Sequence, residues 1–195
     1  LTVSGSLLDA NLGLLNISAA DLSLVARDGV IGGSDTGNLD ADANVNAIDI
    51  AVSSLAANAD SDIYLSEADS LTVTAVAALT VNLGSALRAD FNSTASSVAR
   101  TRTVSALEDL SSKTDGHIKL VTLAGSLTIE GGTDTQGVSA GDDGDVLLEA
   151  RGTGGDIIVN ADVISGTGHI TLDAANDVRV NAAVTTTGAG VVYLL

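Results

Sequence analysis

The sequence predicts an all-β fold, a β-solenoid in which coils of about 21–24 residues stack on one another. Three observations predict it: the apolar residues are almost all small and aliphatic, turn-forming residues are dense along the chain, and one short phrase recurs. The phrase stands at residues 156–161 (DIIVNA), 169–174 (HITLDA) and 177–182 (DVRVNA). We expect residues 1–195 to form a single solenoid segment, a fragment of a longer repeat protein.

The composition indicates a folded chain with a narrow aliphatic interior. Apolar residues make up 45% of the sequence, yet Trp, Met, Cys and Pro are absent and only two Tyr and one Phe occur. Small branched side chains suit thin stacked layers, where a large ring would interrupt the repeat. The 21 Gly, together with many Asn, Asp, Ser and Thr, supply turns at a density that long helices do not tolerate.

Short apolar-x-apolar segments mark the expected strands, each with two inward-facing side chains. The pairs are Leu1/Val3, Leu15/Ile17, Leu22/Leu24, Ile48/Ile50, Ile63/Leu65, Leu71/Val73, Leu79/Val81, Ile118/Leu120, Leu127/Ile129, Val146/Leu148, Ile157/Val159, Ile170/Leu172, Val178/Val180 and Val192/Leu194. Near the C-terminus, every second strand begins after 24, 21 and 22 residues, counted from Val146 to Ile170, Ile157 to Val178 and Ile170 to Val192. Two interleaved series predict at least two strands per coil.

A meander of β-hairpins is the alternative arrangement for such short strands. Hairpin turns are commonly about two to five residues long and contain Asn-Gly or Asp-Gly, whereas identical phrases here lie a full period apart. Asn160 and Asn181 both stand in a Val-Asn-Ala phrase. With coils about 4.8 Å apart, we expect their side-chain amides to hydrogen-bond along the stack. The alternative is that both are solvent-facing turn residues.

Residues 85–113 break the repeat. Leu87, Phe91 and Val98 are spaced as on one face of a helix, and Leu107 and Leu110 continue the spacing. The segment also contains four of the eight basic residues, Arg88, Arg100, Arg102 and Lys113. We expect an irregular or partly helical excursion from the coil stack.

The strongest candidate site is residues 38–49, NLDADANVNAID. Oxygen-bearing side chains occupy positions 1, 3, 5, 9 and 12 of an EF-hand-type loop; they belong to Asn38, Asp40, Asp42, Asn46 and Asp49. The stretch resembles the calcium loop of dockerin modules, which implies a calcium ion. Ala43 replaces the usual Gly, and Val45-Asn46-Ala47 is itself the recurring phrase, so the repeat alone accounts for half of the match.

A second acidic cluster contains Asp142, Asp143 and Asp145, on a Gly-rich turn before a strand. It resembles calcium-binding β-roll repeats and is a second candidate calcium site. The tandem G-G-x-G-x-D nonapeptide of those repeats is missing. A solvated corner of the solenoid is therefore the alternative.

His117 and His169 both follow Gly and precede Ile. In other coils the same slot carries an aspartate, namely Asp62, Asp145, Asp156 and Asp177. This equivalence predicts a surface position that opens a strand. We expect no catalytic residue, because neither a neighbouring carboxylate and nucleophile nor HExxH spacing accompanies the histidines.

The charge and the terminal sequence narrow the classes of partner. A net charge of −17 disfavours nucleic acid and anionic membranes and attracts cations such as calcium. The absence of Cys excludes disulfides and is compatible with export as an unfolded chain. Apolar runs of about 18 residues are missing, so we expect no membrane insertion. Residues 1–10 lack Met, a basic region and a cleavage site, which is expected for a processed section or a fragment.

Five phrases carry a resemblance to a known family. They are SDIYLSEADSLTVTA (61–75), GDVLLEA (144–150), GDIIVNA (155–161), GHITLDA (168–174) and NDVRVNA (176–182). They resemble the right-handed parallel β-helix repeats of filamentous-haemagglutinin-like exoproteins and giant bacterial surface adhesins, over residues 45–83 and 116–195. The resemblance implies an extracellular or cell-surface rod without catalytic activity: a stalk, filament or adhesin segment, stiffened by calcium. Its expected partners are neighbouring repeats or further copies stacked end to end, and a host-cell or matrix surface.

Two other functions fit a parallel β-helix. A polysaccharide-active enzyme resembling pectate lyases, or a carbohydrate-binding module, needs a sugar cleft with aromatic platforms, and three aromatic residues with dispersed Arg argue against one. A cohesin-type or ice-binding recognition domain needs a flat face of Thr. The stretch LTVTAVAALTVN at residues 71–82 is too short to establish it.

Overall fold

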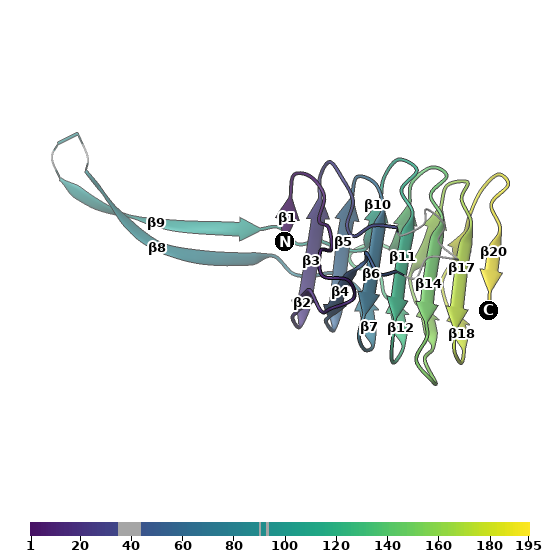
Figure 1. The fold of residues 1–195 in the computed structure, drawn as a ribbon. Helices are drawn as coiled ribbons and strands as arrows, with labels where there is room; N and C mark the ends of the chain where they lie inside the picture. The colour runs from purple at the N-terminus through teal and green to yellow at the C-terminus, as the bar shows by residue number, and fades with distance from the viewer. Residues whose placement is uncertain (35–43, 90, 93) are drawn as a thin grey trace. The chain divides into compact units, whose positions relative to one another are not determined.

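The structure is a computed structural model that describes residues 1–34, 44–89, 91–92 and 94–195. Within these residues the regular elements are β-strands and there is no helix, so the all-β prediction is confirmed (Figure 1). The chain divides into two compact units, which we call the layered unit (Leu1–Val76 and Glu108–Leu195) and the hairpin unit (Ala77–Leu107). In the part of the chain that the structure describes, no helix is long and apolar enough to cross a membrane.

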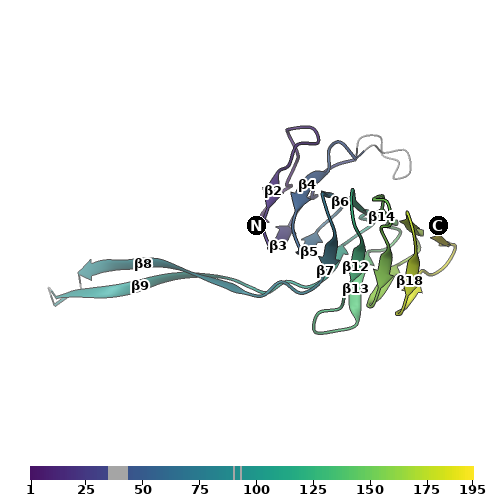
Figure 2. The same cartoon turned by 90° about the horizontal axis from the view of Figure 1, so that it is seen from below.

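A seven-stranded parallel sheet extends through the layered unit. In order across the sheet its strands are β2 (Ile17–Ser18), β4 (Ile48–Ala51), β6 (Ile63–Glu67), β11 (Ile118–Thr122), β14 (Val146–Ala150), β17 (Ile170–Ala174) and β20 (Val192–Leu194). Because the order across the sheet is also the order along the chain, successive segments of the sequence lie side by side (Figures 1 and 2).

The second parallel sheet of the layered unit has eleven strands. They are β1 (Thr2–Val3), β3 (Asp21–Ala26), β5 (Ser54–Ala59), β7 (Leu71–Val73), β10 (Leu110–Ser112), β12 (Leu127–Ile129), β13 (Gln136–Ala140), β15 (Ile157–Val159), β16 (Asp162–Ser165), β18 (Val178–Val180) and β19 (Val184–Thr185). We call three strands in chain order, one from the first sheet and two from the second, a layer. The strands β11–β13, β14–β16 and β17–β19 are three such layers.

Equivalent aliphatic residues of successive layers pair with one another. Leu120 lies opposite Leu65 and Leu148, and all three are 0% exposed. Val159 pairs with Val180 in one sheet, as the repeat predicts; Val180 belongs to the last strand of its series and is 43% exposed. Each fully buried aliphatic side chain contributes about 1.5–3 kcal/mol relative to an exposed one. The core of the layered unit is therefore a stack of small aliphatic side chains.

The strand β5 pairs with two strands of the next layer at once. Its residue Leu55 lies opposite Val73 of β7, and Ala57 lies opposite Leu110 of β10. In β5 a single residue separates these two positions, whereas in the next layer residues 74–109 separate them. The hairpin unit is thus an insertion at one corner of the layered unit.

The same corner varies in length in the following layers. Residues 130–137 separate Ile129 of β12 from Val138 of β13, while only residues 160–162 separate Val159 from Val163. Equivalent residues lie just before successive strands of the seven-stranded sheet. From each to the next, the spacings are accordingly 28, 24 and 22 residues, counted along His117, Asp145, His169 and Val191. Variable corners between constant strands explain why the repeat in the sequence is irregular.

The hairpin unit contains β8 (Leu79–Ala89) and β9 (Ala95–Val104), which pair antiparallel. The partly helical structure predicted within residues 85–113 is therefore wrong: the described part of this segment contains β9 and β10 and the end of β8, and no helix. Thr and Val, which recur in residues 95–104, favour strands because they are β-branched. Every residue of β8 is exposed, so no core is present against which an amphipathic helix could pack.

Candidate functional site

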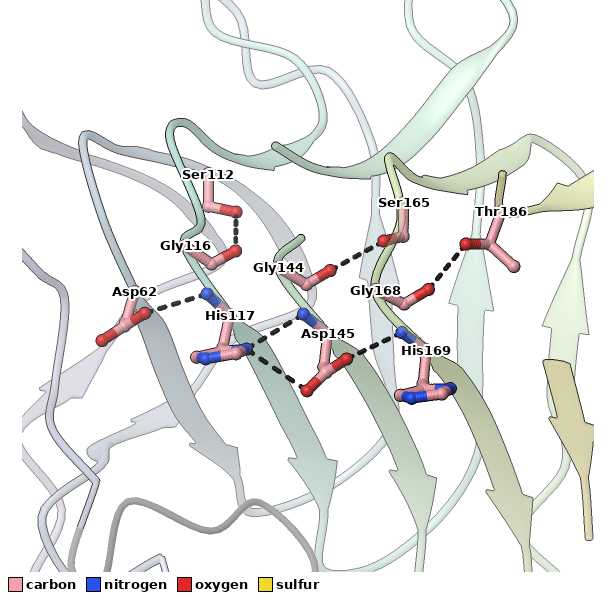
Figure 3. A network of polar contacts seen from close by, with 10 residues as sticks. All are labelled: Asp62, Ser112, Gly116, His117, Gly144, Asp145, Ser165, Gly168, His169 and Thr186. Atoms are coloured by element: carbon pink, nitrogen blue, oxygen red, sulfur yellow. Dashed lines mark hydrogen bonds and ion pairs between the residues drawn. The ribbon is translucent and has the colours of Figure 1, made fainter. Parts of the chain in front are cut away.

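A ladder of side chains runs along the corner that precedes the seven-stranded sheet (Figure 3). The backbone N–H of His117 donates to Asp62 Oδ1 at 2.9 Å, and that of Asp145 donates to His117 Nδ1 at 2.9 Å. The N–H of His169 then donates to Asp145 Oδ1 at 2.7 Å, and that of Val191 to His169 Nδ1 at 3.1 Å. Each of these side chains therefore accepts a hydrogen bond from a backbone N–H of the next layer, at the point where the parallel pairing of the strands begins.

This geometry assigns the tautomer of both imidazoles. Because Nδ1 of His117 and of His169 accepts a hydrogen bond, the ring proton lies on Nε2. Asp145 Oδ2 also lies 3.6 Å from His117 Nδ1. The two histidines thus open strands at the surface, as predicted, and each accepts a backbone hydrogen bond at Nδ1.

A second ladder precedes β12, β15 and β18 in the eleven-stranded sheet. Ser126 N donates to Ser70 Oγ at 3.1 Å, Asp156 N to Ser126 Oγ at 3.0 Å, and Asp177 N to Asp156 Oδ1 at 3.2 Å. The sequence predicts one equivalent position for two histidines and four aspartates, but the structure divides them between two ladders. The first contains Asp62, His117, Asp145 and His169, and the second contains Asp156 and Asp177. Asp156 performs the same structural role on a different sheet. Asp177 takes part through its backbone N–H, while its carboxylate accepts from Arg179 Nη2 at 3.1 Å.

The predicted amide stack is present at the corner after β15 and β18. Asn181 Nδ2 donates to Asn160 Oδ1 at 2.7 Å, and Asn160 Nδ2 donates to Glu130 Oε1 at 2.7 Å. Both asparagines are also exposed, so they face solvent while their amides bond along the stack. The amide column stabilises the same corner that varies in length in other layers.

The corner before the seven-stranded sheet is also tightly packed in its backbone. A Cβ at Gly116 would lie 2.7 Å from the carbonyl oxygen of Ser61 in the preceding layer. Hydroxyl groups pair the glycine carbonyls: Ser112 Oγ donates to Gly116 O at 2.5 Å, Ser165 Oγ to Gly144 O at 2.7 Å and Thr186 Oγ1 to Gly168 O at 2.6 Å (Figure 3). These hydrogen bonds use the serine and threonine hydroxyl groups to hold the glycine backbone of this corner in place.

The three aspartates of the second candidate calcium site do not act together. Asp145 belongs to the ladder described above, whereas Asp142 and Asp143 are exposed on the preceding turn. A hydrogen bond with the Asp115 carboxyl group, followed by the negative charge of Asp115, raises the pKa of Asp143. Asp142 has a left-handed backbone with φ of 45°. The corner is therefore a region of high negative charge density.

Only part of the dockerin-like loop can be placed. Asn38, Asp40 and Asp42 lie outside the described residues, and calcium binding there stays a prediction. The backbone carbonyl oxygen of Asn46 accepts a hydrogen bond from the backbone N–H of Gly33 at 2.9 Å. Asp49 lies on β4, where burial raises the pKa of its carboxyl group, and its Oδ2 is buried with no hydrogen-bond partner among the described residues.

Buried polar side chains are the functional candidates that the sequence did not reveal. Glu67 is 0% exposed at the end of β6, and its carboxylate accepts from Val52 N at 3.0 Å and from Asp69 N at 3.3 Å. Burial raises the pKa of Glu67. Lys119 on β11 is 1% exposed and lies opposite Tyr64 and Leu147. An ionisable residue among strand-forming neighbours, as in DIYLSE and HIKLVT, is the only signal of these positions in the sequence.

Asp109, just before β10, is a buried carboxyl group whose pKa is strongly raised. Burial, followed by the charges of Asp134 and Glu108, raises its pKa to about 6. Its Oδ1 is buried and has no hydrogen-bond partner among the described residues. Glu108 beside it is paired, because its Oε1 accepts from Thr133 Oγ1 at 2.8 Å.

One hollow of about 200 Å³ is lined by Glu149, Ala150, Arg151, Asp173 and Ala175. Ligand pockets are commonly about 300–1,000 Å³. Arg151 is already engaged there, donating to both carboxylate oxygens of Glu149 at 3.1 and 2.7 Å.

The described side chains form no group of three or more His, Cys, Asp or Glu that could hold a metal ion. Comparison of the chain with protein-family models, with curated protein sequences and with solved structures finds no match. The chemistry of the site is thus known only from its own geometry, a set of polar ladders that pair one layer with the next.

Proposed function

We propose that the chain is a segment of a right-handed parallel β-helix, a β-solenoid with about 21–24 residues in its regular coils. We propose further that it is a noncatalytic structural or adhesive rod segment of a secreted or cell-surface bacterial exoprotein. The observation that carries the proposal is the stacking of equivalent residues, spaced 24, 22 and 21 residues apart, into continuous ladders.

The polar residues support a structural role because the described corner side chains mainly bond to other layers. Asp and His side chains of one ladder, Ser and Asp of another, and Asn of a third all pair groups one layer away. An enzyme needs polar groups that converge on a substrate. Here they are spread along corners at the layer spacing of about 4.8 Å.

Neighbouring repeats, or further copies stacked end to end, are the proposed partners of the layered unit. The last strands expose aliphatic and aromatic surface: Val180 is 43%, Tyr193 51% and Leu194 52% exposed. A sheet edge with unpaired N–H and C=O groups favours the addition of another strand. A host-cell or matrix surface is the proposed target of an adhesive segment, and calcium bound at residues 38–49 is the proposed stiffening ion.

Duplication of one layer tests the solenoid. A second copy of residues 157–177 inserted after Asp177 should add one layer, because Ile157 pairs with Val178. We expect a folded protein in which the stack of layers lengthens by about 4.8 Å for each inserted copy, which small-angle X-ray scattering detects as a rise in the radius of gyration. Loss of the β-sheet circular-dichroism signal in the duplicated protein would reject the solenoid.

Functional assays test the rest of the proposal. Saturable binding of the chain to cells or matrix proteins supports adhesion, and turnover of uronic-acid polymers at alkaline pH with calcium would replace the structural role by a lyase activity. Melting the protein with and without calcium tests the ion, since a calcium-stiffened segment melts higher when calcium is present. An unchanged melting temperature removes calcium from the proposal.

A further inference from the structure

The hairpin unit differs from the rest of the chain in charge. Residues 77–107 contain three Arg and one Asp, a net charge of +2, so the remainder carries −19 against −17 for the whole chain. The layered unit is therefore strongly acidic, and the hairpin is a basic segment within the same molecule. The pairing of the two strands determines which face of the hairpin carries this positive charge.

The register of β8 and β9 places all three arginines on one face. Arg100 and Arg102 alternate with Thr101 and Thr103 on β9, so they point to one side of the ribbon. Val81 lies opposite Arg102 and shares that side. A register shift between Asn82 and Ser85 then changes the side to which later β8 residues point.

The register shift matters for the third arginine. Beyond it, Arg88 lies opposite Ser96, which is on the same side of β9 as Arg100 and Arg102. Without the extra residue, Arg88 would point to the opposite side. We call this side the arginine face; it contains Leu79, Val81, Val98, Arg88, Arg100 and Arg102.

The opposite side of the ribbon is uncharged among the described residues. Thr80 and Thr103 pair there, their hydroxyl oxygens 3.1 Å apart, and Asn82 lies opposite Thr101. The two faces thus differ in charge: one carries the arginines beside aliphatic residues, whereas the other is neutral and contains Leu87, which is 82% exposed. An antiparallel ribbon of two strands is only marginally stable in water when both faces are exposed.

The exposed aliphatic residues of the arginine face would gain from being covered. Leu79 is 60%, Val81 40% and Val98 44% exposed. Arginine binds carboxylates through two parallel hydrogen bonds and packs its stem on apolar surface, so an acidic protein surface complements this face.

The layered unit supplies such a surface. At one corner Asp115, Asp142 and Asp143 are exposed together, and the closeness of Asp115 raises the pKa of Asp143, so negative charge is crowded there. At physiological salt, repulsion between whole molecules is screened beyond about 8 Å. Contacts between a basic ribbon and an acidic surface can therefore outweigh the net repulsion of two acidic chains.

We propose that the arginine face of β8–β9 is a docking surface for a second copy of this chain, whose acidic layered unit it binds. The proposal does not rest on the adhesive or structural function, because it depends only on register, exposure and charge. It describes a lateral contact between copies, distinct from end-to-end stacking through the terminal strands.

Sedimentation velocity of the full chain from about 1 to 200 µM in 0.15 M NaCl tests the proposal. We expect concentration-dependent self-association that the double substitution Arg100→Gln with Arg102→Gln weakens at least about tenfold. The matched control, Thr101→Glu with Thr103→Glu, adds negative charge to the opposite face and should leave the association within about threefold of the original.

Other results would overturn the docking surface. A chain that stays monomeric over the whole range lacks it, and equal effects of the two double substitutions would mean that overall charge, not one face, controls association. Self-association that persists unchanged in the Arg100→Gln, Arg102→Gln protein would show that copies meet elsewhere. That last result agrees with end-to-end stacking, so the failure of this inference is distinguishable from failure of the proposed function.

Circular dichroism of each double variant establishes that its fold is intact before association is compared. A third protein, in which Asn-Ala-Asp replaces residues 74–109, lacks the hairpin and retains the layered unit. It should not self-associate laterally, yet it should bind the unmodified chain. Absence of that binding, with both proteins folded, would also overturn the proposal.

Discussion

The layered unit and the hairpin unit are both made of strands, yet they obtain their stability differently. In the layered unit, β6 and β11 are buried along their whole length, and leucines such as Leu65 and Leu120 are 0% exposed. In the hairpin unit, every residue of β8 is exposed. The comparison teaches that strand-forming composition alone does not create a core; the parallel stacking of layers does, because it covers each aliphatic residue with its equivalents.

The largest expected effect comes from core truncation. Leu120→Ala removes a side chain that packs between Leu65 and Leu148, and we expect a loss of about 3 kcal/mol in the free energy of unfolding. Leu87→Ala, the control, changes a residue of the hairpin that is 82% exposed and should cost less than about 0.5 kcal/mol. Urea denaturation measures both. Similar losses in the two variants would contradict the comparison.

The second prediction concerns the buried carboxyl group where the chain returns to the layered unit. The pKa of Asp109 in the folded state, about 6, exceeds the ordinary value of 3.8. Stability from this group is therefore complete at low pH and is lost as the pH rises from about 4 to about 6. Asp109→Asn removes the charge and suits the left-handed backbone, where φ is 66°.

We expect Asp109→Asn to raise the free energy of unfolding by about 1–2 kcal/mol at pH 8 and to change it little at pH 3.5. Thermal or urea unfolding at the two pH values checks the difference. Asp28→Asn, at an exposed position, is the control. A gain that is equal at both pH values would refute the assigned cause.

The third prediction addresses the ladder of Figure 3. His117→Ala removes the acceptor for Asp145 N and should cost about 1 kcal/mol. His117→Asn can supply a side-chain oxygen to the same N–H and should recover part of the loss. Urea unfolding and amide hydrogen exchange at Asp145 report the two effects. If Ala and Asn variants are equally stable and equally protected, the ladder contributes nothing.

The smallest effect is expected from removing the hairpin. Replacing residues 74–109 with Asn-Ala-Asp reproduces the short connection of residues 160–162 between β15 and β16. Because the hairpin residues bury little surface, the melting temperature of the layered unit should change by only about 2–4 °C. Differential scanning calorimetry checks this. A fall of about 15 °C or more would mean that the hairpin is part of the core.

The repeat of the layered unit could be predicted because its strongest strands carry two large apolar residues. Every predicted apolar-x-apolar pair has at least one member on an observed strand. The strands β13 (QGVSA) and β16 (DVIS) were missed, since Gly, Ser or Ala takes the place of a second large residue. With them missing, the sequence predicted at least two strands in each coil, whereas three form a layer.

The candidate site could be predicted only in part. The Asn160 and Asn181 amides and the strand-opening position of His117 follow from equivalence within the repeat. The direction of each hydrogen bond, the separate ladder of Asp156 and the burial of Glu67 do not, because they depend on which sheet a strand joins and on what covers its outer face. Calcium at residues 38–49 remains a prediction.

By itself the sequence determined that this chain is all-β and that residues about two dozen positions apart are equivalent, because stacking demands the same side chain in each layer. Only the tertiary structure decided that β8 and β9 form an exposed ribbon and that Arg88 joins Arg100 and Arg102 on one face. A single extra residue in β8 controls that choice. Such a shift leaves no periodic trace in the sequence, since it is a property of the pairing between two strands.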